Sequence, residues 1–146
     1  MRIMAVDYGD ARTGVAVSDE SATLAGNAWV IKSRNINETA SAVADEAKAR
    51  DVFRIVVGYP KNMDGTIGSR AEKCESFANL LRSMCSIEVV FRDERLTTKS
   101  ANRILTETGK FGKKRKNTVD AVAAVLILED YLAFIKNVKG VKGTGG

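Results

Sequence analysis

Apolar residues follow two different periods along this chain. Short apolar runs bounded by turn residues predict strands at about 2–8, 14–18, 23–32, 53–59 and 87–92. Apolar residues that recur every three or four positions predict helices at about 35–47, 69–85, 97–108 and 118–136. The predicted order of elements is therefore β-β-β-α-β-α-β-α-α.

This order predicts the fold class. Short turns join the first three strands, so we expect them to be antiparallel. Helices separate the later strands, and a strand–helix–strand crossover joins parallel strands. We predict an α/β fold with a mixed five-stranded sheet, three antiparallel strands followed by parallel β-α units, flanked by helices. Residues 1–138 suffice for a single domain, and the glycine-rich residues 139–146 are expected to form a disordered tail.

An aspartate ends the first predicted strand. Residues 3–6 are all apolar, Asp7 follows them, and a glycine-containing turn leads to the second strand. A carboxylate at the end of a buried strand is costly unless it is paired, hydrogen-bonded or bound to a cation. Asp7 is therefore a candidate for chemistry. The alternative is that its side chain caps the turn.

Two adjacent acids close the last predicted strand. Asp93 and Glu94 follow a run of isoleucine, valine and phenylalanine. In a regular strand their side chains point to opposite faces, so only one of them shares a face with Asp7. Glu94 is slightly favoured for that position. The alternative for both acids is an ion pair with Arg92 or Arg95.

A further acid lies on the apolar stripe of the last predicted helix. Asp120 has helical spacing to the apolar positions Ala123, Ala124, Ile127, Leu128 and Tyr131. An acid in the first turn also complements the helix dipole, which is the alternative interpretation. The dipole does not explain why Asp120 falls on the buried side of the helix.

These acids predict a metal site. We expect the two acid-bearing strands to be parallel neighbours, so that their acids can converge at the carboxyl edge of the sheet, where open α/β sheets form ligand crevices. An acid from a covering helix would make a cluster of three, which repels itself unless divalent cations neutralise it. Paired cations can activate a water and stabilise the leaving oxygen of a phosphodiester.

The composition narrows the possible chemistry. The 146 residues include no histidine, which excludes Ser-His-Asp, Cys-His and HExxH machinery. Hydrolysis must therefore use carboxylates, lysine, or water on a metal with oxygen ligands, which suits Mg²⁺ or Mn²⁺ rather than zinc. Cys74 and Cys85 have helical spacing too long for a disulfide, so two reduced thiols are expected.

The charge distribution indicates a polyanionic partner. The net charge is +5 and the pI is about 9.3. A basic stretch before the last helix accounts for the whole excess, and it consists of Lys110, Lys113, Lys114, Arg115 and Lys116. Such a cluster on an otherwise balanced chain suggests nucleic acid. The alternative is a solvated lysine-rich loop.

No apolar stretch reaches the roughly 20 residues needed to cross a membrane. The first residues also meet an acid too soon for a signal peptide. We therefore expect a cytoplasmic protein with no membrane partner.

Four segments, in this order, are similar to motifs of the YqgF/RuvX family: 7–19, 57–66, 93–98 and 113–124. The resemblance covers nearly the whole chain except the tail. It implies an RNase H-like fold and a nuclease whose metal-binding acids are Asp7, the Asp93/Glu94 pair and Asp120. It also implies one of two substrates, the 5′ end of pre-16S ribosomal RNA or a Holliday junction.

The leading hypothesis is a Mg²⁺- or Mn²⁺-dependent endonuclease acting on structured nucleic acid. Asp7 would bridge the metals, Glu94 or Asp93 would bind one, and Asp120 would complete the site. The basic stretch, with Arg12 and Arg95, would hold phosphates.

Two other classes stay open. One is an ATP-binding protein of the actin or sugar-kinase type, although such proteins close two domains around the nucleotide. The other is a non-catalytic nucleic-acid-binding factor. The oligomeric state is also open, since a resolvase needs a dimer to cut two strands and an RNA-trimming enzyme does not.

Overall fold

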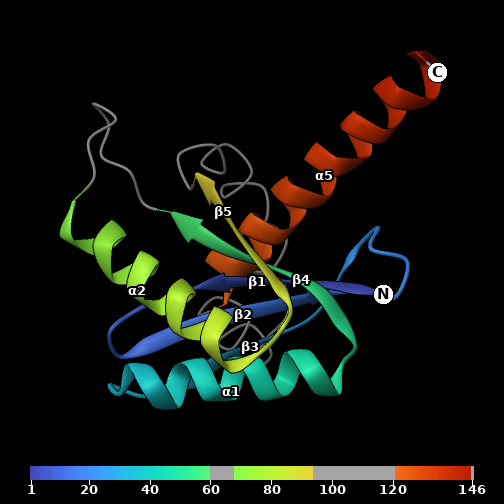
Figure 1. Cartoon of the computed structure of the whole chain (residues 1–146). Coiled ribbons are helices and arrows are strands. Elements are labelled where there is room, and N and C mark those ends of the chain that lie inside the picture. Colours follow the sequence, from blue (N-terminus) through green and yellow to red (C-terminus); the bar gives the residue numbers. More distant parts are fainter. Residues whose placement is uncertain (60–67, 94–120, 146) are drawn as a thin grey trace, which may run out of the picture.

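The computed structural model describes residues 1–59, 68–93 and 121–145, with side chains in the last segment as far as Asn137. The described elements follow one another along the chain (Figure 1). They are β1 (Arg2–Asp7), β2 (Arg12–Ser18), β3 (Ala25–Lys32), α1 (Ile36–Ala49), β4 (Val52–Tyr59), α2 (Ser69–Met84), β5 (Glu88–Asp93) and α5 (Val122–Gly145). The helix predicted at about 97–108 lies outside the described residues.

The strands form one mixed sheet in the order β3-β2-β1-β4-β5. The pairs β1–β2 and β2–β3 are antiparallel, and the pairs β1–β4 and β4–β5 are parallel. The predicted five-stranded α/β sheet is therefore confirmed. The first strand of the chain lies in the centre of the sheet.

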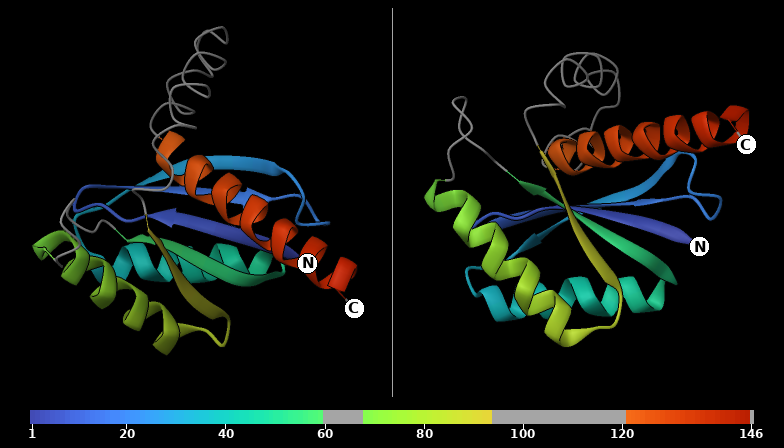
Figure 2. Two further views of the ribbon diagram at one scale, coloured as in Figure 1. Left: turned by 90° about the horizontal axis from the view of Figure 1, so that it is seen from above. Right: turned by 45° about the horizontal axis from the view of Figure 1, so that its top comes forward.

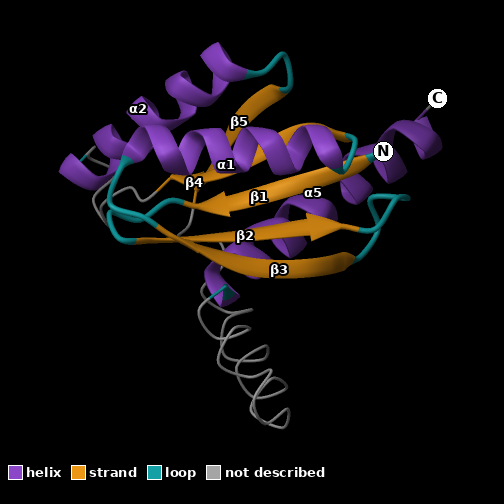
Figure 3. Ribbon diagram, turned by 90° about the horizontal axis from the view of Figure 1, so that it is seen from below, coloured by secondary structure: helices purple, strands orange, loops and turns teal. Residues whose placement is uncertain are grey.

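Helices cover both faces of the sheet. Helices α1 and α2 pack on one face, and α5 crosses the other (Figures 2 and 3). Val6 and Phe77 belong to the core under α1 and α2, whereas Ala5 and Ile127 belong to the core under α5. Because neighbouring strand residues point to opposite faces, each strand contributes to both cores.

The ends of the first two helices differ in how well the sequence predicts them. Asn35 caps α1, and its side chain accepts hydrogen bonds from the backbone of Asn37 and Glu38. In contrast, α2 is capped by Gly68 without a side-chain hydrogen bond, and Ser69 is already helical. The capping-box spacing of Ser69 and Glu72 predicts Ser69 as the cap, and this prediction is wrong by one residue.

Helix α5 extends beyond its predicted end at about residue 136. It continues to Gly145, and its last part projects past the edge of the sheet (Figure 1). Helical hydrogen bonds are local, so the backbone can stay helical without packing against the sheet. Within the described residues, no helix is both long and apolar enough to cross a membrane.

Cys74 is buried in α2, and Cys85 is the residue at the C-terminal cap of this helix. Neither forms a disulfide, as the spacing predicts.

Candidate active site

Asp7 ends the central strand on the face covered by α5. Its neighbours two and four positions earlier, Ala5 and Ile3, lie in the core under α5, and strand alternation gives Asp7 the same direction. Its side chain is 23% exposed. Asp7 therefore presents a partly solvated carboxylate at the carboxyl edge of the sheet.

Glycines flank Asp7 on both neighbouring strands. Gly14 of β2 is its partner in register. On the other side, Val6 pairs with Val57, so the next residue of β4, Gly58, lies beside Asp7. Because glycine has no side chain, neither neighbouring strand places one beside the Asp7 carboxylate. Asp7 is therefore open to other partners.

The turn after Asp7 is held by other residues. Tyr8 points to the opposite face and stacks on Phe77 of α2, with 4.6 Å between the ring centroids. Thr13 Oγ1 lies 3.4 Å from both the amide and the carbonyl of Gly9. A Cβ atom on Gly9 would lie 2.3 Å from the carbonyl oxygen of Arg12, so only glycine fits there. Among the described residues, Thr13 rather than Asp7 closes this turn.

Two cations from α2 reach this turn. Arg70 Nη2 lies 3.7 Å from Asp7 Oδ1, and the Arg70 side chain is 63% exposed. Lys73 Nζ forms a shorter ion pair, 3.0 Å, with Asp10. A hollow of about 220 Å³ lies between the turn and α2, lined by Tyr8, Gly9, Asp10, Ser69, Arg70 and Lys73. Burial, followed by the charge of Asp10, raises the pKa of Tyr8.

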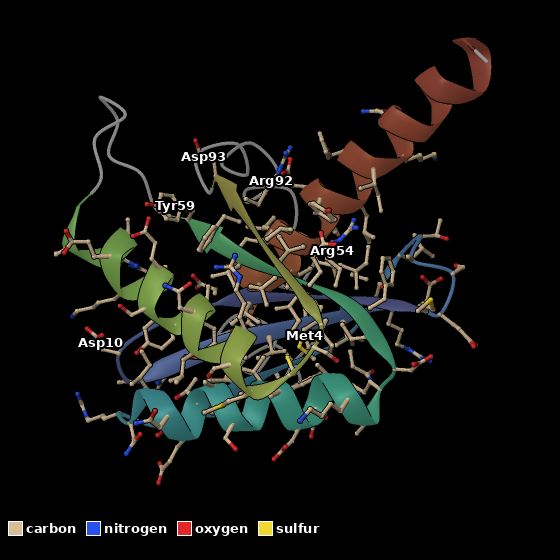
Figure 4. All side chains as sticks on the ribbon, in the orientation of Figure 1. Met4, Asp10, Arg54, Tyr59, Arg92 and Asp93 are labelled. Carbon is tan, nitrogen blue, oxygen red and sulfur yellow. The ribbon has the colours of Figure 1, made fainter. Side chains whose placement is uncertain are left out.

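Asp93 lies on the face opposite Asp7. It pairs in register with Tyr59, whose hydroxyl donates a 2.6 Å hydrogen bond to Glu75 of α2. Figure 4 shows Tyr59 and Asp93 at the tips of β4 and β5. Phe91, two residues before Asp93, packs against the core under α1 and α2. Only one member of the Asp93–Glu94 pair was expected to share the face of Asp7, and the register assigns Asp93 to the other face.

The strands that carry these acids are not neighbours, contrary to the sequence-based expectation. β4 lies between β1 and β5, because each helical crossover adds its strand beside the preceding parallel one. Two strand spacings separate β1 from β5 by about 10 Å. An acid from β5 must therefore reach across Gly58 to approach Asp7.

Polar contacts fix the direction of α5 over the sheet. Arg54 of β4 donates a 2.9 Å hydrogen bond to Tyr131, and Arg92 of β5 pairs with Asp130 at 2.5 Å. These contacts lie beyond the first two turns of the helix. Its start points toward the carboxyl ends of β1 and β4 (Figure 2). Ala121, the residue before α5, is fully buried.

Several predicted site residues lie outside the described part of the chain. They are Glu94, Arg95, Lys110, Lys113, Lys114, Arg115, Lys116 and Asp120. Within the part that is described, no group of three histidine, cysteine or acidic side chains could hold a metal ion. Arg12 is described, and it is exposed at the start of β2. It lies two residues before Gly14, on the same face as Asp7.

Sequence reasoning did not identify Arg70 as a partner of Asp7. The two residues are separated by 63 positions, and no local pattern links them. The glycines beside Asp7 carried a weak signal, because glycine inside a strand often marks a close approach.

Comparisons with known proteins agree with this fold. A solved structure of T. thermophilus RuvC in complex with a Holliday junction substrate superposes with a TM-score of 0.70 at 11% identity, covering 95% of this chain and 96% of that one. The Fowlpox virus resolvase, in complex with Holliday junction DNA, gives 0.62 at 12% identity, covering 92% and 99%. These similarities confirm the predicted RNase H-like fold.

Sequence relatives cover almost the whole chain. A protein of Caldanaerobacter subterraneus subsp. tengcongensis named "Putative pre-16S rRNA nuclease" is 43% identical over 138 residues, covering 94% of this chain and 99% of its own. A protein of Agathobacter rectalis with the same name is 39% identical over 140 residues, covering 94% and 98%. The family described as "RuvX: Holliday junction resolvase" matches residues 1–134. The chain therefore belongs to the RuvX family.

Proposed function

We propose that this protein is a divalent-metal-dependent endonuclease that cleaves phosphodiester bonds of structured nucleic acid. The observation that carries the proposal is the position of Asp7. It lies at the carboxyl end of the central strand, between two glycines and on the face that α5 covers. In open α/β sheets this edge is where ligands bind.

The donor chemistry fits Mg²⁺ or Mn²⁺. Asp7 offers a hard oxygen ligand, and the chain has no histidine to favour a softer metal. Such ions, when bound, activate a water and stabilise the leaving oxygen. The proposed ligands are Asp7, Glu94 and Asp120. In the sequence Asp120 directly precedes Ala121, which is buried next to the start of α5.

Glu94 is preferred to Asp93 as the acid from β5. The register places Asp93 on the face of α2, opposite Asp7. Strand alternation makes the next residue the better candidate for the Asp7 face.

The basic residues supply affinity for the substrate. Arg12 is exposed on the face of Asp7, near the same edge. The basic stretch, Lys110 to Lys116, directly precedes the segment that carries Asp120. Arg95 directly follows Glu94. Contacts of these side chains to phosphates would position the nucleic acid without reading its sequence.

The favoured substrate is the 5′ end of pre-16S ribosomal RNA, by analogy with the names of the relatives that match almost end to end. The second candidate is a Holliday junction, favoured by the family description. A monomer would suffice for RNA, whereas cutting a junction symmetrically would need a homodimer. Either substrate is consistent with a cytoplasmic location.

A cleavage panel tests the proposal. Precursor 16S rRNA and four-way junction DNA are incubated with Mg²⁺, with Mn²⁺ or with EDTA. We expect metal-dependent cleavage of the RNA by the wild-type protein and none by Asp7→Asn. Cleavage of junction DNA alone would support the second candidate. Cleavage of neither substrate, or cleavage that Asp7→Asn retains, would contradict a metal-dependent nuclease that uses Asp7.

A further inference from the structure

The contact between Arg70 and Asp7 differs from the other ion pair at this turn. Arg70 Nη2 lies 3.7 Å from the carboxylate, too far for a hydrogen bond, and the side chain is largely in solvent. Lys73, one helical turn later, lies 3.0 Å from Asp10 and donates a hydrogen bond to it. Arg70 is therefore close enough to neutralise Asp7 but is not locked onto it.

Helix stability does not explain Arg70. It occupies the first turn of α2, where a cation opposes the helix dipole. Its guanidinium instead extends to Asp7, the last residue of β1, which is far from α2 in the sequence. The interaction that Arg70 makes in this position is therefore with the Asp7 carboxylate.

We propose that Arg70 is an exchangeable cation for Asp7. Without metal its charge offsets that of the nearby carboxylate, and the guanidinium must move away when a divalent ion binds there. This inference rests on the proposed role of Asp7 as a metal ligand.

The displaced arginine has a second use at the same edge. A divalent ion at Asp7 would repel the guanidinium, which is long and exposed enough to turn away. Arginine recognises phosphate with a planar pair of donors. Once released, Arg70 would hold a phosphate of the substrate strand beside the metal. Arg70 thus acts as a positioning residue that couples metal binding to substrate binding.

Metal affinity tests the exchange directly. Mn²⁺ binding is measured by electron paramagnetic resonance on the full chain without nucleic acid, for the wild type, Arg70→Gln and Lys73→Gln. Both variants lose one positive charge from α2, but only Arg70 contacts Asp7. Since an exposed ion pair contributes little, we expect Arg70→Gln to bind Mn²⁺ about two- to five-fold more tightly than Lys73→Gln.

Nucleic-acid affinity tests the second role. Binding of a pre-16S rRNA 5′ fragment is measured by rapid mixing with Mn²⁺ and, separately, with EDTA. With Mn²⁺ the Arg70→Gln variant should lose one phosphate contact, which reduces the slope of log affinity against log salt by about 0.7–0.9. With EDTA the loss of slope should be smaller, because the ion pair with Asp7 then competes with phosphate for Arg70.

The outcomes separate this inference from the proposed function. If the wild type binds Mn²⁺ and cleaves RNA, but Arg70→Gln and Lys73→Gln bind Mn²⁺ equally, the exchange is rejected and the nuclease stands. A salt slope reduced to the same extent with and without metal would reject the coupling. If the wild type shows no saturable Mn²⁺ binding, both proposals fail. Arg70→Lys keeps the charge and should bind Mn²⁺ like the wild type, which checks that charge rather than folding is responsible.

Discussion

At the residue scale, Asp7 combines a central position with partial exposure. A carboxylate this close to two buried cores is stable only because it meets solvent and a cation at the edge of the sheet. The same features make it available to a divalent ion. Its role can therefore be tested through stability as well as activity.

Replacing Asp7 by asparagine should remove the stabilisation by metal. In the wild type, Mg²⁺ or Mn²⁺ should raise the melting temperature, because the unfolded chain lacks the assembled site; at about 100 times Kd the gain is about 2.7 kcal/mol. Asp7→Asn should lose this response. Without metal it should stay within about 1 kcal/mol of the wild type, since it loses only a 3.7 Å ion pair to a largely exposed arginine.

Asp10→Asn is the matched control for this experiment. Asp10 lies in the same turn but pairs with Lys73, so its substitution should leave the response to metal intact. Thermal unfolding with metal and with EDTA measures both variants. Collapse of Asp7→Asn in EDTA would instead mean that Asp7 is structural.

The two acids at the end of β5 should differ in their effect on cleavage. Loss of an outer partner of a metal ligand costs about 10- to 100-fold, so Glu94→Gln, which removes a proposed ligand, should reduce cleavage more than about 100-fold. Asp93→Asn should cost far less, because the register turns Asp93 toward α2. Single-turnover cleavage rates measure the difference. Equal losses from two well-folded variants would reject the assignment by strand alternation.

Local patterns predicted Asp7 but not its surroundings. The apolar run Ile3–Val6 predicted β1, and the glycine-containing turn explained why the strand ends where it does. The row of Gly14, Asp7 and Gly58 depends on the register between strands, and the approach of Arg70 depends on how α2 packs. Both are tertiary properties, which a single sequence does not specify.

At the element scale, hydrogen bonds between elements hold the edge of the sheet against α2. Tyr59, the last residue of β4, donates to Glu75. This bond raises the pKa of Tyr59 from 10.0 to about 12. The folded chain therefore favours the protonated phenol more strongly than the unfolded chain does.

Tyr59→Phe should change the pH dependence of stability. Because the pKa of Tyr59 is higher in the folded state, its contribution is complete below about pH 10 and is lost as the pH rises toward about 12. Between these values the unfolding free energy of the wild type should fall relative to that of Tyr59→Phe, as measured by urea denaturation. Glu75→Ala should flatten the same difference, because it removes both the acceptor of the hydrogen bond and the charge that opposes ionisation. A difference between wild type and Tyr59→Phe that does not vary over this pH range would refute the role of the bond.

Strand order was the main element-scale feature that the sequence left open. The β-α-β pattern predicted parallel strands, and the crossovers confirmed it. The assumption that β1 and β5 are neighbours was wrong, because α1 returns the chain to β1 and thereby places β4 between them. Hydrophobic periodicity identifies each helix or strand by itself and does not show which strands pair with one another.

At the scale of the whole molecule, the positive charge should govern affinity for nucleic acid. The basic stretch carries as many charges as the whole net excess of +5. Replacing Lys113, Lys114, Arg115 and Lys116 with alanine should weaken binding by orders of magnitude at low salt. Each lost phosphate contact should reduce the salt slope by about 0.7–0.9. Metal binding should change little, since none of these residues is a proposed ligand.

Filter binding across a salt series measures this prediction for RNA and junction DNA. Alanine at Lys48 and Lys136, two exposed lysines elsewhere on the protein, serves as a control for the loss of charge in general. If the four-alanine variant keeps the affinity and slope of the wild type, the stretch is only solvated. The nucleic acid would then bind at another surface.

The central position of β1 has a consequence for synthesis of the chain. During synthesis β1 emerges before β4 and α5, so it gains its second strand partner only after β4 has been made, and its α5-covered face is closed only once α5 has emerged. The proposed ligands are spread from Asp7 to Asp120, so no early fragment holds all of them. If Asp7, Glu94 and Asp120 are the ligands, we expect a nascent chain to be inactive toward the ribosomal RNA that surrounds it. Activity would begin only when the polypeptide has folded around β1.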